Sequence, residues 1–596
     1  MKSHVAIALV LTAGLALHAQ TRGPAAAGSA TLSGRVVRTE GSAKVPVARV
    51  QVSVGLGDSS GNRIAVTDDQ GRFEFAGLPA GGYLLTASRL GWVTTYYGSP
   101  RPGRPPGIRV VVADGAKASV EVPIVPGSVI AGRIIDENSQ PMARLFPRLL
   151  EQRLVGNRQM LARMRLPYGI GYFERQTNDL GEFRLFGLPP GAYHLVVDPS
   201  IGANTRMTTQ EEVRWALQPP GAVGPAPPQG SIAGYASMYF PGTPDPSLSR
   251  AIVVGPGEVR DGLTFRIGFV PVSRIEGTIQ STDGSPVANV RVSLDARIPQ
   301  VAMEGATRLA NADANGRFVF SSVAPGDYKV SARSLPRPGA EIGTVPMLWA
   351  ETNLVVSGQD TLSTALTLSP ASSMTGRVAF AATSMTPPSD LSTVRLQFVA
   401  TDAQAGAIAG GGTMSATSYN GTVAADGTFR VAGLPPDRYN VSATWPGIRN
   451  ADGAGWWLTS ISLGGKDIGD APIEVRANEE VTNVTLGFRD RIGAIEGLLA
   501  DAAGKPAPEY FVLAFPVERV SWTTTSRRAV PAVHPGTDGR FRVNGLLAGQ
   551  YYLAVVTAVE PDDAMDPAFL EAILPNAVRV TVGEGQAVRQ DLKIGR

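Results

Sequence analysis

One short motif recurs five times along the chain and limits its fold more than any other feature. It reads Asp-x-Gly-x-Phe or a close variant, and a tyrosine follows the phenylalanine after ten residues in every copy. The pairs are Phe73 and Tyr83, Phe183 and Tyr193, Phe318 and Tyr328, Phe429 and Tyr439, and Phe541 and Tyr551. A constant internal spacing, repeated along the whole chain, indicates tandem modules of one architecture.

The motif reads as a β-hairpin. Its aspartate and glycine make a tight turn, in which glycine accepts a positive φ and the aspartate carboxylate caps nearby amides. We assign this capping role to Asp69, Asp179, Asp313, Asp426 and Asp538. A strand of alternating apolar residues follows, then a second turn, and the tyrosine opens the next strand. We expect the phenylalanine and tyrosine to face a core, with the tyrosine hydroxyl bonded to the backbone at its rim.

Further strands flank each hairpin. A glycine-led strand lies upstream in every copy, starting at Gly34, Gly132, Gly277, Gly376 and Gly497. Two closing strands lie downstream, such as 108–112 and 119–124, and we expect them to pair with each other. About seven short strands per ~100 residues is typical of a β-sandwich.

Together the glycine-led strand, the Pro-Val-Ala turn at Pro46 and the hairpin motif resemble the carboxypeptidase regulatory-like domain. This resemblance implies a transthyretin-like (Ig-like, prealbumin-like) sandwich, related in fold to starch-binding-like domains. We therefore expect an all-β protein of five such domains. The predicted boundaries are 29–126, 127–270, 271–370, 371–490 and 491–596, and we call these segments units 1 to 5.

The first twenty residues indicate export. Lys2 precedes an apolar run from Val5 to Leu17, and Ala19 is a plausible cleavage point, so we predict a signal peptide over residues 1–20. No later run of about 18 apolar residues predicts a transmembrane span. These features predict a secreted, periplasmic or cell-envelope protein.

The residues that catalysis or metal binding would need are scarce. The chain has no cysteine and four histidines, of which His4 and His18 lie in the predicted signal peptide. We place His194 on a strand and His534 in a loop, and neither begins a zinc-ligand pair. Asp313 opens a segment like a calcium loop, but no glutamate follows at the required distance, which favours turn capping. We therefore predict no enzyme activity, no metal and no cofactor.

Charge argues against nucleic acid as a partner. The formal net charge is +3, and 47 of the 54 basic residues are arginine. Acidic residues interleave with them throughout, so the sequence predicts no basic stripe for nucleic acid.

Aromatic residues outside the repeated motif are the positive indication of a ligand. The candidates are Trp92, Tyr96, Tyr97, Tyr239, Trp456 and Trp457. Planar rings on loops can stack on sugar faces, anchor a protein interface, or cover the edge of their own core. We expect a structural or adhesive scaffold that binds another envelope or extracellular protein; polysaccharide binding through these rings is the alternative.

Unit 2 departs from the other units by an insertion. Residues 145–164 are rich in arginine and leucine and could form an amphipathic helix. Pro147 is unfavourable in a helix, and Gly156-Asn157 is a turn pair at the middle, so we predict a long β-hairpin.

Overall fold

The computed structural model describes most of the chain after the predicted signal peptide, which lies outside the described residues. The described ranges are 28–56, 62–105, 107–155, 158–164, 176–198, 214, 217–218, 233–287, 290–297, 301–302, 307–334, 347–358, 361–401, 418–446, 454–523, 526–559 and 563–594. Nearly all regular structure in these ranges is β-strand, so the prediction of an all-β protein is confirmed.

The first two units contain the strands β1 to β18. In unit 1 they are β1 (Ala30–Glu40), β2 (Ala43–Pro46), β3 (Gln51–Gly55), β4 (Arg63–Val66), β5 (Arg72–Leu78), β6 (Gly81–Ser88), β7 (Thr95–Tyr96), β8 (Val110–Val112) and β9 (Lys117–Pro123). In unit 2 they are β10 (Ser128–Ile135), β11 (Pro147–Val155), β12 (Arg158–Arg163), β13 (Glu182–Leu188), β14 (Gly191–Val197), β15 (Ala233–Tyr235), β16 (Met238–Tyr239), β17 (Ile252–Val254) and β18 (Val259–Arg266), with the 3-10 turn η2 (Pro246–Leu248).

Units 3 and 4 contain β19 to β36. Those of unit 3 are β19 (Phe269–Pro271), β20 (Ser273–Ser281), β21 (Val290–Arg297), β22 (Val301–Ala302), β23 (Arg308–Asn311), β24 (Arg317–Val323), β25 (Gly326–Ser334), β26 (Leu348–Val356) and β27 (Thr361–Pro370). Those of unit 4 are β28 (Ser372–Ala381), β29 (Arg395–Ala400), β30 (Ser418–Val423), β31 (Thr428–Leu434), β32 (Asp437–Thr444), β33 (Ala454–Leu463), β34 (Lys466–Asp467), β35 (Ile473–Val475) and β36 (Glu480–Arg491).

Unit 5 combines strands with short helices. Its elements are β37 (Gly493–Ala500), β38 (Phe511–Pro516), η4 (Arg519–Ser521), β39 (Arg540–Leu546), β40 (Gly549–Val556), η5 (Asp563–Met565), α3 (Pro567–Ile573), η6 (Leu574–Asn576), β41 (Val578–Val582), β42 (Ala587–Arg589) and β43 (Leu592–Lys593). No helix in the described part of the chain has the length and apolar character needed to span a bilayer.

One strand pattern recurs in every unit. The glycine-led strand pairs antiparallel with the motif strand and parallel with the last strand of the unit, as β1 does with β5 and β9. The motif tyrosine is the third residue of its strand, not the first as expected, and that strand belongs to a second sheet, as β6 does with β3 and β4. The glycine-led strand likewise begins four residues before its glycine in every unit. The two sheets enclose a core of their own in each unit. The exact domain boundaries stay a prediction.

The closing strands differ from our expectation. β8 pairs with β6 in the second sheet, whereas β9 pairs with β1 in the first sheet. β41 and β43 are divided in the same way, pairing with β40 and β37. The expected pairing between the two closing strands is therefore wrong in units 1 and 5, where each strand closes a different sheet of the sandwich. In unit 3 the equivalent strands β26 and β27 do pair antiparallel, through Leu348 with Pro370 and Trp349 with Ser369.

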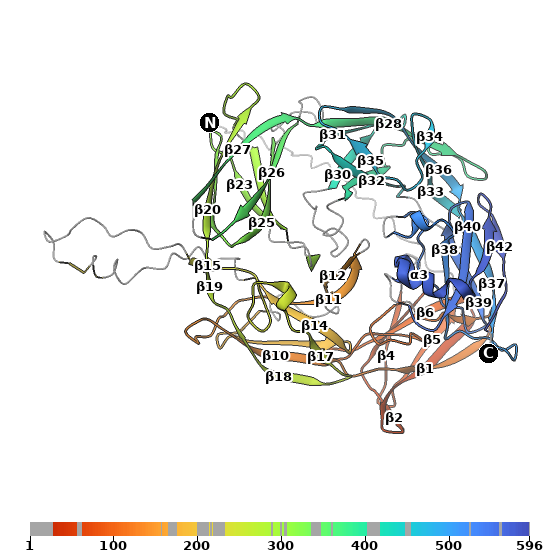
Figure 1. Ribbon diagram of the computed structural model, residues 1–596. Helices are drawn as coiled ribbons and strands as arrows, with labels where there is room; N and C mark the ends of the chain where they lie inside the picture. The colour runs from red at the N-terminus through yellow and green to blue at the C-terminus, as the bar shows by residue number, and fades with distance from the viewer. Residues whose placement is uncertain are drawn as a thin grey trace, which may run out of the picture.

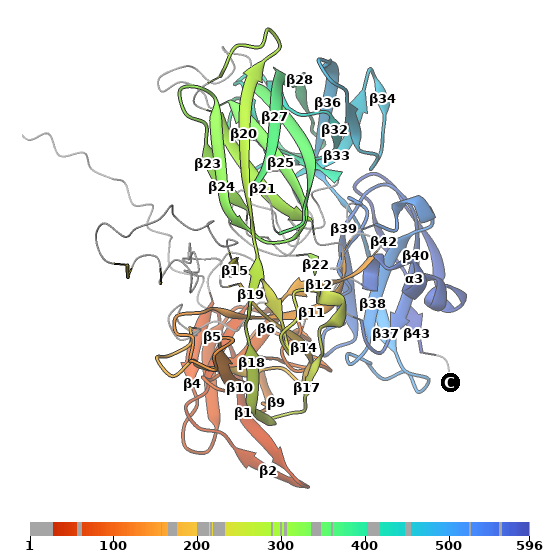
Figure 2. The same cartoon turned by 60° about the vertical axis from the view of Figure 1, so that its left-hand side comes forward.

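The five sandwiches follow one another around a ring (Figure 1). The sheets with the glycine-led strands β1, β10, β20, β28 and β37 lie on the outside, and the second sheets with β6, β14, β25, β32 and β40 lie toward the middle (Figure 1). A view turned by 60° shows units 3 and 4 stacked above units 1 and 2, with unit 5 beside them (Figure 2). The first and last units are therefore neighbours in space.

The motif phenylalanine packs onto the glycine of the first strand. The two residues are direct partners in every unit: Gly34 with Phe73, Gly132 with Phe183, Gly277 with Phe318, Gly376 with Phe429 and Gly497 with Phe541. A Cβ atom on Gly376 would lie 2.8 Å from Phe429 Cζ and would also clash with the Val484 carbonyl oxygen of the last strand. Only glycine fits between the aromatic ring and the closing strand.

The motif tyrosine bonds to the turn that precedes its strand. Its hydroxyl donates to the carbonyl four residues upstream: Tyr83 to Pro79 (2.7 Å), Tyr193 to Pro189 (2.7 Å), Tyr328 to Ala324 (2.9 Å), Tyr439 to Pro435 (2.7 Å) and Tyr551 to Leu547 (2.8 Å). Burial raises the pKa of Tyr193 and Tyr328 to about 12, so these hydroxyls stay protonated donors. The expected backbone partner of the tyrosine is confirmed in all five units.

The capping of the motif turn corrects our assignment in units 1 and 2. Asp68 Oδ1, not Asp69, accepts the amides of Gln70 and Arg72. Asn178, not Asp179, has this role in unit 2. The glycine amide donates to the carbonyl of the residue three positions earlier, and this bond closes the turn. The first residue of each Asp-Asp or Asn-Asp pair is in that position and is therefore the cap.

In units 3 to 5 the expected turn residues act as caps. Asp313 accepts the amides of Asn315 and Arg317, which confirms its capping role. Asp426 and Asp538 each accept one amide.

The insertion of unit 2 forms the predicted hairpin. β11 and β12 pair antiparallel from Leu150 with Arg163 to Val155 with Arg158. The far edge of β12 then pairs in parallel with β22 of unit 3, through Leu161 with Val301 and Ala162 with Ala302. The insertion thus extends the second sheet of unit 2 into the next unit.

Unit 5 carries an additional layer. All six residues of β38 are buried, because one face contacts the sandwich core and the other contacts a second cluster beneath α3. Asp566 caps α3 by accepting the Ala568 amide at 2.9 Å, and Leu570 of the helix is fully buried on the sheet.

A buried carboxylate fixes one loop of unit 4. Asp490, 0% exposed near the end of β36, accepts hydrogen bonds from the amides of Thr383 (2.8 Å), Ser384 and Met385 (2.7 Å) and from the Ser384 hydroxyl. Burial raises the pKa of Asp490, but these hydrogen bonds outweigh it and hold the pKa well below its ordinary value.

Replacing the first-strand glycine should destabilise a unit. We expect Gly376→Ala to lower the free energy of unfolding by about 1–3 kcal/mol, because the new methyl group overpacks the contact with Phe429. Gly268→Ala is the matched control, since a Cβ there meets nothing within 4 Å. Chemical denaturation of both variants measures the difference, and an equal effect of the two would contradict the packing argument.

Replacing Asp490 should destabilise unit 4 in a pH-dependent manner. We expect Asp490→Asn to lower the free energy of unfolding at neutral pH by roughly 1.5–3 kcal/mol, because hydrogen bonds to a charged acceptor contribute about that much. The folded pKa lies below the ordinary value of 3.8, so this stabilisation is complete above that value and is lost as the pH falls through the folded pKa.

Urea unfolding from neutral to acid pH measures this effect. The gap between the wild type and Asp490→Asn should narrow as the pH falls. The exposed Asp390 provides the control variant Asp390→Asn, which should change stability by less than about 0.5 kcal/mol. A gap that stays constant down to acid pH would show that the charge of Asp490 does not matter.

Candidate functional site

The three aromatic candidates of unit 1 do not form one platform. Tyr97 is half-buried on the unit 1 core, and its amide donates to the Leu85 carbonyl at 2.9 Å. Tyr96 belongs to β7 and lies opposite Thr86. Since successive side chains of a strand point to opposite faces, Tyr96 lies on the outer face of the second sheet.

Trp92 lies at the boundary between units 1 and 2. It is half-buried against the unit 1 core and forms a β-bridge with Pro126. The Arg89 guanidinium carbon is 5.6 Å from the centroid of its ring. The Trp92 side chain thus helps to cover the edge of its own sandwich.

Two further candidates are buried, which corrects the expectation of exposed rings. Tyr239 is 0% exposed, in a cluster with Leu150, Leu161 and Val301 between units 2 and 3. Trp456 is 3% exposed and packs edge-to-face on Phe380 in the unit 4 core. Neither ring can contact a ligand while the protein is folded.

Trp457 is half-buried on the opposite side of β33, where it pairs with Arg489 of β36. Tyr96 and Trp457 thus keep partly exposed rings away from the cores of their units. Trp92 and Tyr97 are equally half-buried but pack against the unit 1 core.

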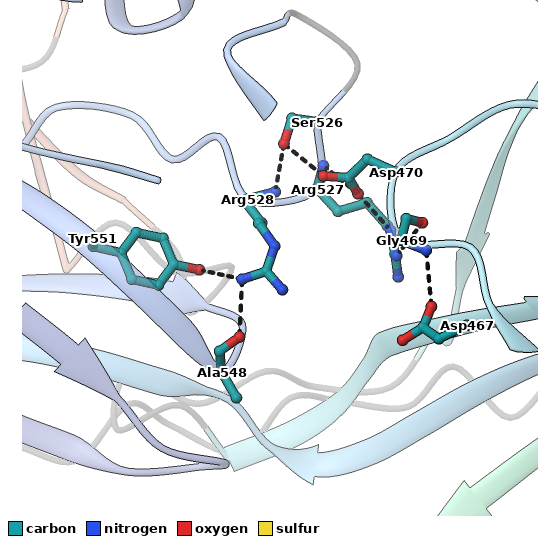
Figure 3. Close-up of polar contacts among 8 residues, drawn as sticks. All are labelled: Asp467, Gly469, Asp470, Ser526, Arg527, Arg528, Ala548 and Tyr551. Atoms are coloured by element: carbon teal, nitrogen blue, oxygen red, sulfur yellow. Dashed lines mark hydrogen bonds and ion pairs between the residues drawn. The ribbon is translucent and has the colours of Figure 1, made fainter. Parts of the chain in front are cut away.

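The contact between units 4 and 5 contains a polar network (Figure 3). Asp470 of unit 4 accepts a hydrogen bond from the Ser526 hydroxyl (2.7 Å) and forms an ion pair with Arg527 (3.0 Å). Arg527 also donates to the Gly469 carbonyl at 2.6 Å. Because both charged side chains are mostly buried, the pair holds the two units in one orientation.

The neighbouring Arg528 bonds within unit 5. Its guanidinium donates to the Ala548 carbonyl at 2.9 Å and to the Tyr551 hydroxyl at 3.4 Å (Figure 3). Consecutive arginines therefore connect the motif tyrosine of unit 5 to the surface of unit 4. Nothing in the repeated motif predicted this pair, since the two arginines lie outside the motif, in the loop before β39.

Other neighbouring units meet through different chemistry. Arg104 of unit 1 forms an ion pair with Glu151 of unit 2 at 2.7 Å. Arg333 of unit 3 lies 4.7 Å from the centroid of the Tyr419 ring in unit 4 and donates to its hydroxyl. Each contact uses residues that differ between units, so the contacts are specific to their position in the chain.

Both histidines of the described chain have structural environments. His194 lies on β14, with Nδ1 2.8 Å from the Ser249 hydroxyl, and burial lowers its pKa. His534 lies in a loop, where Nδ1 is 3.0 Å from the carbonyls of Pro508 and Tyr510 and burial again lowers the pKa. Their expected positions on a strand and in a loop are confirmed. The described residues include no group of three His, Cys, Asp or Glu side chains arranged to hold a metal ion.

Several solved structures are similar to parts of this chain. The TIE protein of Bacillus anthracis is 9% identical, with 78% of this chain and 74% of that chain covered and a TM-score of 0.13. A streptococcal ancillary pilin is 11% identical, with 57% and 98% covered and a TM-score of 0.20. The major pilin subunit of Bacillus cereus is 10% identical, with 57% and 99% covered and a TM-score of 0.13. At these TM-scores the matches carry no argument about function.

The sequence itself identifies the domain type. No curated protein matches the chain. The model of the carboxypeptidase regulatory-like domain matches residues 31–123, which span β1 to β9, and residues 274–362, which span β20 to the start of β27. The chain therefore contains repeated carboxypeptidase regulatory-like domains, with unit 1 and unit 3 as the matched copies.

Proposed function

We propose that the protein is a non-catalytic scaffold, exported from the cell, that holds unlike loops in fixed relative positions for another envelope or extracellular protein. The observation that carries this proposal is the use of the recurring side chains. The phenylalanine packs on its glycine, the tyrosine hydroxyl bonds to a turn, and every unit carries an Asp or Asn cap on the motif turn. Each of these groups is satisfied inside its own unit and is not available for chemistry.

The contacts between units support the same proposal. Neighbouring sandwiches are held together by direct contacts as well as by their linkers. Examples are the ion pair of Asp470 with Arg527 and the pairing of β12 with β22. A scaffold needs this rigidity, because a binding surface made from two units loses less entropy when the units are already oriented.

Polysaccharide binding is the second candidate, and the position of Tyr96 favours it. Tyr96 lies in one row of the unit 1 second sheet with Thr86, Ser53 and Ile64. This row carries no charge, and Ile64 is 60% exposed. An aromatic ring beside small hydroxyl side chains on a sheet face is suited to stacking on a sugar and bonding to its hydroxyls.

Binding assays on the mature chain test the two candidates. The chain without residues 1–20 is applied to a glycan array and to insoluble polysaccharides, and bound protein is measured. If sugars bind at the proposed row, we expect Tyr96→Ala to reduce binding about 5- to 13-fold, because loss of one stacking contact costs roughly 1–1.5 kcal/mol. Trp349→Ala, a half-buried tryptophan of unit 3 outside the candidate set, is the matched control.

The outcomes separate the candidates. Absence of binding to every glycan eliminates the polysaccharide candidate and leaves the scaffold proposal standing. Mass spectrometry of the same mixtures tests for turnover, and product formation that requires the intact chain would overturn the non-catalytic proposal.

A further inference from the structure

Units 1 and 5, the first and last units, contact each other although no linker joins them directly. Arg109 and Val111 flank Val110, the first residue of β8, whose other edge pairs with β6 in unit 1. Thr537 of unit 5 donates its amide to the Arg109 carbonyl at 3.1 Å, and its hydroxyl accepts the Val111 amide at 3.3 Å. We call this pairing of residues 109–111 with residues 536–537 the closing contact.

The closing contact satisfies backbone groups at a sheet edge. The carbonyl of residue 109 and the amide of residue 111 both project from the side of β8 that is turned away from β6. Unpaired groups of this kind make a strand edge ready to accept another strand or turn. Thr537, in the turn of unit 5, bonds to both of these backbone groups, as a residue of a neighbouring strand would.

The part of unit 5 that makes this contact is its own motif turn. The Gly536 amide donates to the Arg540 carbonyl (2.7 Å), and the Gly539 amide donates to the Gly536 carbonyl (2.8 Å). The same two hydrogen bonds define the motif turn in the other units, where the residue equivalent to Gly536 is Asp68, Asn178, Asp313 or Ala424. Residue 536 thus occupies the position that holds a capping side chain in units 1 to 3.

Unit 5 departs from the repeat at that position in a way that fits the contact. A Cβ on Gly536 would lie 2.8 Å from Val111 Cγ2, so a side chain there would collide with the Val111 side chain in the closing contact. Its φ is not in the left-handed region, so the backbone does not require glycine. The turn still has a cap, because Asp538 accepts the Arg540 amide at 3.1 Å.

We infer that the motif turn of unit 5 is a docking site for the β8 edge of unit 1, and that this docking closes the chain into a ring. The partner is the other end of the same chain. The inference goes beyond the proposed function and holds whether or not a ligand binds. It also accounts for the glycine at position 536, where units 1 to 4 have Asp68, Asn178, Asp313 and Ala424.

An engineered disulfide tests the closing contact directly, since the chain has no cysteine of its own. In the full mature chain we combine Val111→Cys with Gly536→Cys and oxidise with copper phenanthroline. Val111→Cys removes the Cγ2 atom that a Cβ at position 536 would meet, and the short distance between the two side-chain positions suits a disulfide. We expect most molecules to form an intrachain bond, seen as a reducible mobility shift of the monomer and as one cross-linked peptide by mass spectrometry.

A control pair uses the opposite edge of the same sheet. Ile64→Cys combined with Gly536→Cys should not cross-link, because β4 is separated from β8 by about three strand spacings, or ~14 Å. Absence of the bond in the test pair would overturn the inference. So would interchain dimers whose yield rises with protein concentration, because they would assign the contact to two copies.

A second variant tests closure without cysteine. Gly536→Asn restores the residue type that unit 2 has at this position, and we expect it to open the ring and increase the radius of gyration in small-angle X-ray scattering. Ala424→Asn is the matched control, because Ala424 occupies the same position in unit 4 and is exposed. Thermal unfolding shows that both variants fold. A folded Gly536→Asn protein with unchanged dimensions would contradict closure through this turn.

Discussion

Each sandwich depends on the close approach of a phenylalanine ring to a glycine in the neighbouring strand. The ring occupies the space that a Cβ would need, and the last strand of the unit lies against the same glycine from the other side. This contact fixes the register of three strands at one point, because a shift by one residue would place a side chain where none fits. The tyrosine ten residues later then attaches the second sheet by its hydroxyl.

The units are joined by a different principle. Inside a unit the same residues recur, whereas ion pairs and cation–π contacts between units use residues that do not recur, such as Arg104 with Glu151 or Arg333 with Tyr419. Contacts that differ at each boundary define the order of the units and oppose pairing between wrong neighbours. They also let the second sheets gather toward the middle of the ring (Figure 1).

The sequence predicted what depends on local spacing and missed what depends on a second layer. The hairpins, the core positions of Phe429 and Tyr439, and the β11–β12 insertion follow from alternation and turn residues, which act over a few positions. The capping residues Asp68 and Asn178 were missed because two neighbouring polar residues suit a turn equally well, and the hydrogen-bond register decides between them.

The burial of individual aromatic side chains was harder to predict from the sequence. Tyr239 and Trp456 are covered by residues far away in sequence, such as Val301 for Tyr239, and no local pattern reveals that. The additional layer of unit 5 did leave a signal: the unbroken apolar run of β38, from Phe511 to Pro516, is typical of a strand buried on both faces.

The pairing of β12 with β22 has a consequence for how the molecule comes apart. Units 2 and 3 share backbone hydrogen bonds and the buried cluster around Tyr239, so separating them exposes apolar surface and unpaired strand edges together. In a chain of independent beads, each bead would melt with its own transition. Here units 2 and 3 should melt together in one cooperative transition, so the block that unfolds is larger than the repeated sequence unit.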